Sequence, residues 1–270
     1  METSPTAILE WTALFSPVTQ MFLIFLEQNV GYNEEINLIH SKLDAEEMQT
    51  TRMLVNAHID PGILFKERGD TERSIEHLET ALKLTKKCDG ESGLREGEIS
   101  DHLGMLYASR SDFASAKLHY STAYSVYEKT IGRDDLTTSD CAFRLGNVLE
   151  ALQSNLALDF YKESLRVHRL NMAEDNERVG DILCCLARLF LGSESHQDAV
   201  GCFEEALSIR KRLLGDCSDV AETYHNLGKT YNEMSQNDKA LIFYRESVRI
   251  NKKISNHDAL RNVSWDMVRM

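Results

Sequence analysis

The sequence predicts an all-α fold, a solenoid of antiparallel helix pairs stacked side by side. A set of small and apolar residue types recurs five times, at intervals of 41 or 42 residues. Within each interval the apolar residues are spaced by three and four, as in helices, and short polar turns separate them. Proline occurs only at positions 5, 17 and 61, so no proline interrupts the later helices.

The clearest copy of the repeat lies between Ala221 and Ser247, and six of its positions recur in the other four copies. Three of these positions are used below. The glycine position holds Gly62, Gly104, Gly146, Ala187 and Gly228; the aromatic position holds Leu78, Tyr120, Tyr161, Phe203 and Tyr244; the last position holds Ala81, Ala123, Ser164, Ala206 and Ser247. Small residues let the two helices of a pair approach closely, and the large rings fill the space around that contact.

The order of Leu-Gly, an aromatic residue, an alanine and a second aromatic residue resembles the tetratricopeptide repeat. The resemblance covers roughly Met48 to Ser255. The period exceeds the usual ~34 residues by about two helical turns, and such long repeats are similar to those of kinesin light chains. HEAT repeats and WD40 blades share the period but not these residues. The resemblance implies a right-handed superhelix whose concave groove, lined by the first helix of each pair, binds a peptide or a partner segment.

The repeats divide the chain into three parts. Five tandem repeats occupy residues 47–256, at 47–87, 94–130, 137–170, 176–213 and 217–254. Residues 1–46 are predicted to form a helical segment, either a degenerate repeat that caps the solenoid or an independent docking helix. Residues 257–270 are predicted to form a capping helix or a truncated sixth repeat. Trp265 falls 41 residues after Tyr224, and we expect it to pack inward.

The start of the chain shows no targeting or membrane-spanning signal. Polar residues interrupt the apolar stretch from Ala7 to Leu26, and its longest clean run, Met21 to Leu26, is too short to cross a bilayer. The first basic residue is Lys42, whereas signal and transit peptides carry early basic residues. The six cysteines show no C-x-x-C spacing, which favours a reducing compartment. We therefore expect a cytoplasmic protein that does not insert into membranes.

Composition and motifs argue against catalysis and against nucleic acid as a partner. The formal net charge is −13, whereas phosphate binding needs a basic face. Gly228-Lys229-Thr230 matches the end of a phosphate-binding loop, but Thr223 stands where that loop requires glycine. Asp134 and Asp135 are interpreted as helix-start residues in a loop between repeats. The sequence therefore predicts no enzyme, no cofactor and no metal site.

The first helices are expected to present a stripe of side chains to the groove. Asn147, Arg188 and Lys229 occupy equivalent positions in three consecutive repeats, and stacking would place them in a row. An acidic edge, defined here as Glu98, Asp101, Asp140, Asp181 and Glu222, follows the same face. The row either holds a peptide carboxylate or merely neutralises Asp181 and Glu222. The candidate groove residues are Asn147, Arg188, Lys229, Asp101, Phe143, Met105, His225, Asn232, Glu150 and Asp181.

The resemblance implies a protein–protein interaction module, an adaptor or scaffold, whose partner is a protein or peptide with acidic groups. Two alternatives remain at this point. The solenoid could be a structural subunit whose groove is occupied by its own chain, and the apolar N-terminal segment makes that reading credible. It could also be a motor-linked cargo adaptor of the kinesin light chain type, although no heptad-repeat segment precedes the repeats here.

Overall fold

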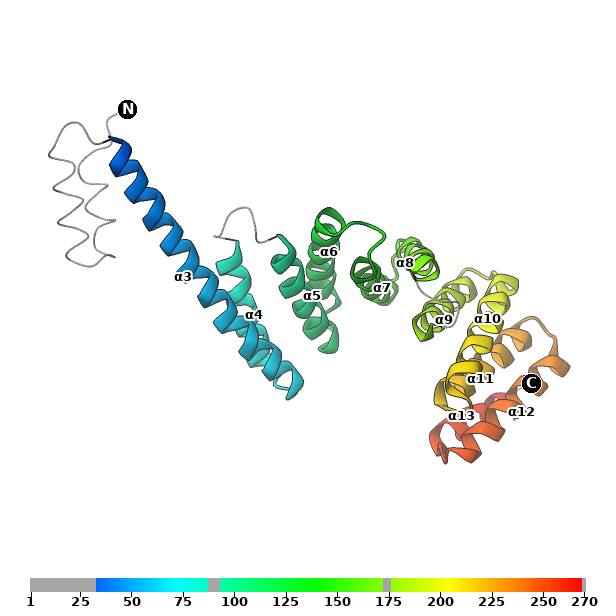
Figure 1. The fold of residues 1–270 in the computed structure, drawn as a ribbon. Coiled ribbons are helices and arrows are strands. Elements are labelled where there is room, and N and C mark those ends of the chain that lie inside the picture. Colours follow the sequence, from blue (N-terminus) through cyan, green and yellow to red (C-terminus); the bar gives the residue numbers. More distant parts are fainter. Residues whose placement is uncertain (1–32, 87–92, 172–175, 269–270) are drawn as a thin grey trace.

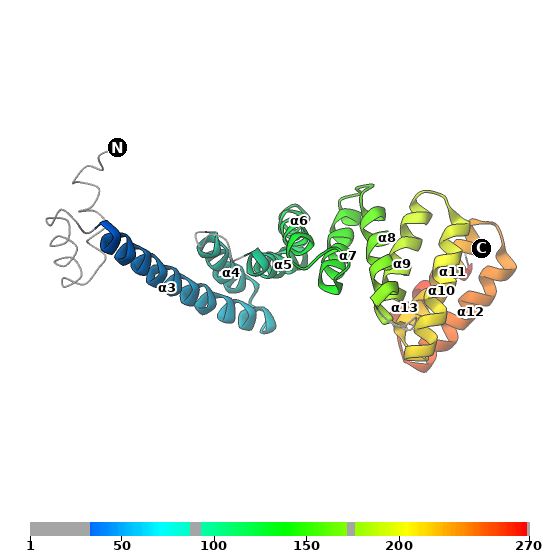
Figure 2. The same ribbon diagram turned by 45° about the horizontal axis from the view of Figure 1, so that its top comes forward.

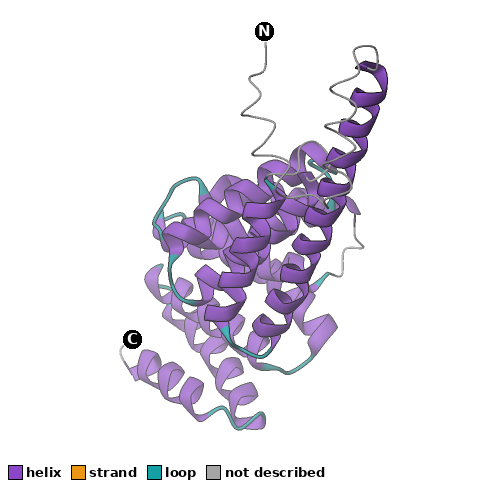
Figure 3. Cartoon of the chain, turned by 90° about the vertical axis from the view of Figure 1, so that its left-hand side faces the viewer, coloured by secondary structure: helices purple, strands orange, loops and turns teal. Residues whose placement is uncertain are grey.

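The computed structural model describes residues 33–86, 93–171 and 176–268, and this part of the chain is entirely helical outside its turns (Figure 3). Its eleven helices confirm the prediction of an all-α fold with five antiparallel pairs and a further C-terminal helix. The pairs are α3 (Asn33–Glu67) with α4 (Thr71–Thr85), α5 (Gly93–Ser109) with α6 (Phe113–Thr130), α7 (Leu136–Ala151) with α8 (Ala157–Asn171), α9 (Glu177–Gly192) with α10 (His196–Leu214), and α11 (Ser218–Glu233) with α12 (Asn237–Lys253), followed by α13 (His257–Val268).

Consecutive pairs stack into one elongated, curved array, with α3 at one end and α13 at the other (Figures 1 and 2). Each second helix contacts the first helix of the next pair. First helices also contact one another, α3 with α5, α7 with α9 and α11 with α13. They therefore lie on one side of the array, and we call the surface they share the inner face.

The turn inside each pair closes in the same way all five times. One residue per turn has a positive φ: Gly69, Ser111, Gln153, Glu194 and Ser235. The next backbone N–H donates to a carbonyl in the last turn of the first helix, as in Asp70 to Phe65 and Gln236 to Tyr231. Only the first turn uses glycine, so four turns accept the cost of a side chain in the left-handed region.

The glycine position meets the aromatic position inside each pair. A Cβ added to Gly146 would lie 2.6 Å from the ring of Tyr161, and one added to Gly228 would lie 2.6 Å from the ring of Tyr244. Both rings are fully buried and therefore have no room to move aside. Because glycine has no side chain, the two helices can pack at this distance.

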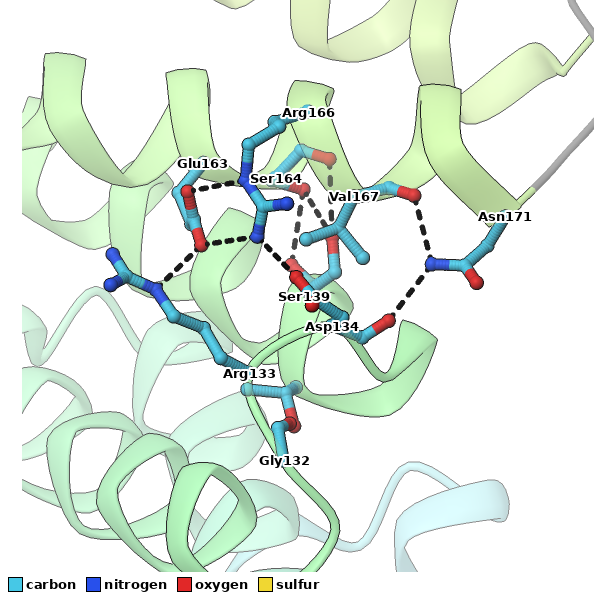
Figure 4. Close-up of polar contacts among 10 residues, drawn as sticks. Gly132, Arg133, Asp134, Ser139, Glu163, Ser164, Arg166, Val167 and Asn171 are labelled. Carbon is cyan, nitrogen blue, oxygen red and sulfur yellow. Dashed lines mark hydrogen bonds and ion pairs between the residues drawn. The ribbon is translucent and has the colours of Figure 1, made fainter.

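A polar cluster fastens the loop before α7 to the end of α8 (Figure 4). Arg166 binds both Glu163, one turn earlier on α8, and Asp134 in the loop, while Asn171 donates to the Asp134 carbonyl. Asp135 caps α7 by accepting from the Thr137 N–H at 2.7 Å, as expected of a helix-start residue. Repeat five repeats the arrangement, since Arg249 binds Glu246 and the loop residue Asp216.

The N-terminal predictions fall partly outside the described residues. Residues 1–32, with the apolar stretch from Ala7 to Leu26, are not among them. Among the helices that are described, none is long and apolar enough to cross a bilayer. α3 runs without a break through residue 47 and through Pro61 to Glu67, so the boundary placed at residue 46 does not coincide with a helix end. The domain boundaries and the capping role of residues 1–46 stay predictions.

The prediction that Trp265 packs inward is wrong, because its side chain is 57 % exposed. Val263 takes the inward position instead, at 1 % exposure, within the apolar cluster of the last two repeats. Tyr224, the residue that Trp265 was matched to, packs against Phe243 of the second helix of its own pair. Within the described residues no second helix follows α13, so a side chain at this position faces outward.

Two glycine-to-alanine changes, one at the glycine position and one outside it, should have opposite effects on the free energy of unfolding. Gly228→Ala should lower the free energy of unfolding, because forcing a methyl group against a buried ring costs about 1–3 kcal/mol. Gly201→Ala should raise it by up to ~1 kcal/mol, because Gly201 lies within α10, has nothing within 4 Å and gains only helix propensity. Urea unfolding of both variants measures the difference. Equal effects would contradict the close contact.

The position of α13 predicts unequal effects for two valines on the same helix. Val263→Ala should lower the free energy of unfolding by about 1–2 kcal/mol, because it leaves a cavity in a buried cluster. Val268→Ala is the matched control, since that side chain is 81 % exposed and its loss should change little. Thermal unfolding followed by circular dichroism reports both. A larger effect at Val268 would mean that α13 packs by another face.

Candidate functional site

The inner face carries the predicted groove residues at very different exposures. Asn147, Arg188, Lys229 and Met105 are exposed. Partly buried are Asp101, Glu150, Asp181, His225 and Asn232, whereas Phe143 is buried. The structure therefore leaves the row of Asn147, Arg188 and Lys229 open to solvent, while much of the remaining set is engaged within the protein.

Asn147 and Arg188 belong to one connected cluster between α7, α8 and α9. Arg188 binds Glu150 through Nε at 3.1 Å and Nη2 at 3.3 Å, and Nη2 also donates to Sγ of Cys185. The hydroxyl of Tyr161 lies 2.7 Å from both Asn147 Oδ1 and Glu150 Oε2. Burial raises the pKa of the Cys185 thiol despite the neighbouring guanidinium, so the thiol stays protonated.

The acidic edge is largely neutralised by arginines of the same protein. Asp101 forms a bidentate salt bridge with Arg144 on α7, the first helix of the next pair, at 3.0 and 2.7 Å. Asp140 binds Arg178 at 3.1 Å, and Asp181 binds Arg210 at 2.7 Å. Burial raises the pKa of Asp101 even beside Arg144. Burial also acts on Asp140, but His168 and Arg178 outweigh it and lower the pKa.

These pairs correct the expectation that Arg188 and Lys229 neutralise Asp181 and Glu222. Arg188 binds Glu150 on the preceding first helix, and Asp181 is held by Arg178 and Arg210. Lys229 is exposed, and no hydrogen bond or ion pair within the described residues involves it. Of the two cations in the row, Arg188 is paired with Glu150, whereas the Lys229 side chain has no partner within the described residues.

Two other candidate residues have structural partners. The buried ring of Phe143 lies beneath the Arg178 guanidinium, 5.1 Å from its centroid. His225 Nε2 lies 2.7 Å from Asp266 on α13, which ties the last helix to α11. Cys141, Cys184, Cys185, Cys202 and Cys217 are free thiols. No group of ligating side chains within the described residues could hold a metal ion.

Sequence reasoning missed a second column of equivalent positions, four residues after the last position of each repeat. It holds Thr85, Tyr127, His168, Arg210 and Asn251, all buried polar or aromatic side chains near the end of a second helix. His168 Nε2 lies 3.3 Å from a carboxylate oxygen of Asp140, without the alignment of a hydrogen bond. Arg210 reaches both Asp181 on its own pair and Thr223 on the next. We call this column the bracing position.

Comparison with known proteins agrees with the repeat pattern. Residues 178–253 match the sequence model of the tetratricopeptide repeat. Residues 178–253 of the chain are tetratricopeptide repeats. The protein KINESIN LIGHT CHAIN-RELATED 2 of Arabidopsis thaliana is 23 % identical over 199 residues, which are 68 % of this chain and 29 % of that protein. The chain spans less than a third of the length of the curated relatives it matches.

Two solved structures share the fold of this chain. BtubC (BKLC) from P. vanneervenii superposes with a TM-score of 0.66 at 19 % identity, over 86 % of this chain and 93 % of that one. A putative kinesin light chain from Podosopora anserina with nearly identical TPR-like repeats superposes with a TM-score of 0.64 at 15 % identity, over 76 % and 97 %. The prediction of kinesin light chain-like repeats is thereby confirmed at the level of fold and sequence family.

Acid should weaken the N-terminal repeats through His102. Burial, with Lys66 and Arg144 nearby, lowers its pKa to about 4, and Lys66 Nζ donates to Nδ1 at 3.0 Å, which requires the neutral ring. The folded pKa is below the ordinary value, so the unfolded chain binds the proton first. The stabilisation is complete above pH ~6.5 and is lost as the pH falls towards 4. Urea unfolding between pH 4.5 and 7 should show a weaker pH dependence for His102→Gln than for the unmodified chain, and identical slopes would contradict this assignment.

Proposed function

We propose that the protein binds an acidic segment of a partner protein along the inner face, with Lys229 and Arg188 as its cationic contacts. Tetratricopeptide repeat proteins are generally protein–protein interaction modules and typically non-enzymatic scaffolds. The observation that carries the finer proposal is the state of Lys229. It is exposed in the row of equivalent positions and has no partner within the described residues, so its charge is available to a ligand carboxylate.

The partial neutralisation of the acidic edge supports this proposal, although Glu98 and Glu222 stay exposed. In a chain with a net charge of −13, each carboxylate that is paired on the inner face reduces the repulsion of an acidic ligand. Asp101, Asp140 and Asp181 each contact an arginine, so their charges are offset locally. Met105 and Asn147 add exposed apolar and hydrogen-bonding surface on earlier repeats.

The internal ion pair of Arg188 changes how the proposal is best tested. Reversing Arg188 would leave Glu150 facing a second carboxylate and would damage the fold as well as the site. Glu150→Gln avoids this, because it releases Arg188 towards a ligand and keeps a hydrogen-bonding side chain beside Tyr161. Lys229→Glu should also leave the fold intact, because the Lys229 side chain has no partner within the described residues.

The test begins with a pull-down using the chain and maps the bound segment by overlapping peptides. Lys229→Glu should weaken binding of the mapped peptide at least tenfold, because a charge-assisted contact worth about 1.5–3 kcal/mol becomes a repulsion. Glu150→Gln should strengthen it. Binding should also weaken as salt rises, since exposed charges are screened beyond ~8 Å at physiological ionic strength.

The control places the same charge change on second helices. Lys117→Glu and Lys162→Glu alter exposed lysines on α6 and α8, away from the inner face, and should leave the peptide affinity unchanged. Isothermal titration measures all variants with one peptide. If the lysine controls weakened binding as much as Lys229→Glu, net charge rather than the inner face would govern the interaction.

A further inference from the structure

The last repeat contains a cavity where the preceding repeat contains a buried guanidinium. Arg210, at the bracing position of repeat four, is 9 % exposed and sits between α9, α10 and α11. Its Nη2 donates to Asp181 Oδ1 at 2.7 Å, and its Nη1 donates to Thr223 Oγ1 at 3.0 Å and to the Asp219 carbonyl at 3.3 Å. A carboxylate, a hydroxyl and a carbonyl thus hold this cation.

Repeat five carries a shorter, neutral side chain at the bracing position. Asn251 occupies the position equivalent to Arg210, and Glu222 occupies the position equivalent to Asp181. Between α11, α12 and α13 there is a cavity of about 290 Å³. Its lining includes Glu222, Ser247, Asn251 and Asn262, and it contains no lysine or arginine.

Asn251 presents an unused acceptor to this cavity. It is 2 % exposed, and its Oδ1 has no hydrogen-bond partner in the described structure. The orientation of the amide is fixed by its neighbour. Ser247 Oγ donates to the Ala221 carbonyl at 2.7 Å, so it can only accept from Asn251 Nδ2, at 3.3 Å. The oxygen must therefore be the free end, and an unsatisfied buried acceptor is costly.

We propose that this cavity is a binding site for an arginine side chain of a partner protein. The guanidinium would donate to Glu222 and to Asn251 Oδ1, as Arg210 donates to Asp181 and its neighbours one repeat earlier. Guanidinium is favoured because its planar fork matches several acceptors at once. The cavity exceeds the ~30 Å³ that one bridging water occupies, and the exposed Glu222 and Asn262 place its opening at the surface. The proposal does not rest on Lys229 or on an acidic ligand.

The direct test uses Nα-acetyl-arginine amide as the probe and Nα-acetyl-citrulline amide as its neutral counterpart. Amide chemical shifts in α11, α12 and α13 should move with the arginine probe and saturate, and the citrulline probe should bind at least tenfold more weakly, because it loses the charge-assisted contact to Glu222. Equal binding of both probes, or none of the arginine probe, would overturn the proposal. Free L-arginine binding more tightly than the capped probe would instead indicate an amino-acid ligand and overturn the assignment to a protein side chain.

Two variants connect the probe to these residues. Glu222→Gln should weaken probe binding at least tenfold, whereas Glu128→Gln, an exposed carboxylate on α6, should not change it. Asn251→Arg should restore the arrangement of repeat four, since its own guanidinium fills the cavity. It should therefore abolish probe binding and raise the unfolding midpoint. An Asn251→Arg variant that folds and still binds the probe would place the site elsewhere, and Glu222→Gln decides the matter if that variant does not fold.

Discussion

The structure depends on one recurring contact, in which a glycine on the first helix of a pair packs against a large buried ring on the second helix. Gly104, Gly146 and Gly228 leave less than 3 Å between a would-be Cβ and the facing tyrosine. That contact fixes the distance and the register of the two helices in a pair. Because this contact recurs along the chain, the register passes from one repeat to the next, and equivalent side chains are expected to lie beside one another along the inner face.

The fold could be predicted because this contact is local and repeated. Both partners lie within about 16 residues of each other, and their residue types recur, so the sequence displays the pairing directly. The end of the array could not be predicted in the same way. Trp265 was placed by counting 41 residues from Tyr224, but Tyr224 is buried by Phe243 on its own second helix. A column therefore predicts burial only where the partner helix is also present, and after α13 no second helix follows among the described residues.

The site was less predictable, because it depends on which charges meet across helices. The spacing predicts Asp101, Asp140 and Asp181 along one edge but could not show that Arg144, Arg178 and Arg210 pair with them. The bracing position was missed for a related reason. It holds five different residue types, and what they share is burial at a junction of three helices rather than chemical identity. A search for buried polar residues at a constant offset from the small positions would have found it.

The ion pairs also show that the last complete repeat leaves one cation and one carboxylate of its first helix unpaired within the described residues. In repeat four, Arg188 binds Glu150 and Asp181 binds Arg210, so both signs of charge are satisfied internally. Their equivalents on α11, Lys229 and Glu222, are exposed and make no ion pair within the described residues, because Asn251 is neutral and the charged side chains of α13 pair elsewhere, Asp266 with His225 and Arg261 with Asp258. Lys229 and Glu222 lie two turns apart on one helical face, about 10 Å. An extended partner segment covers that distance in about three residues. A single segment carrying an acidic residue and an arginine at that spacing would satisfy both charges at once, and it would complete in repeat five the pairing that repeat four already contains.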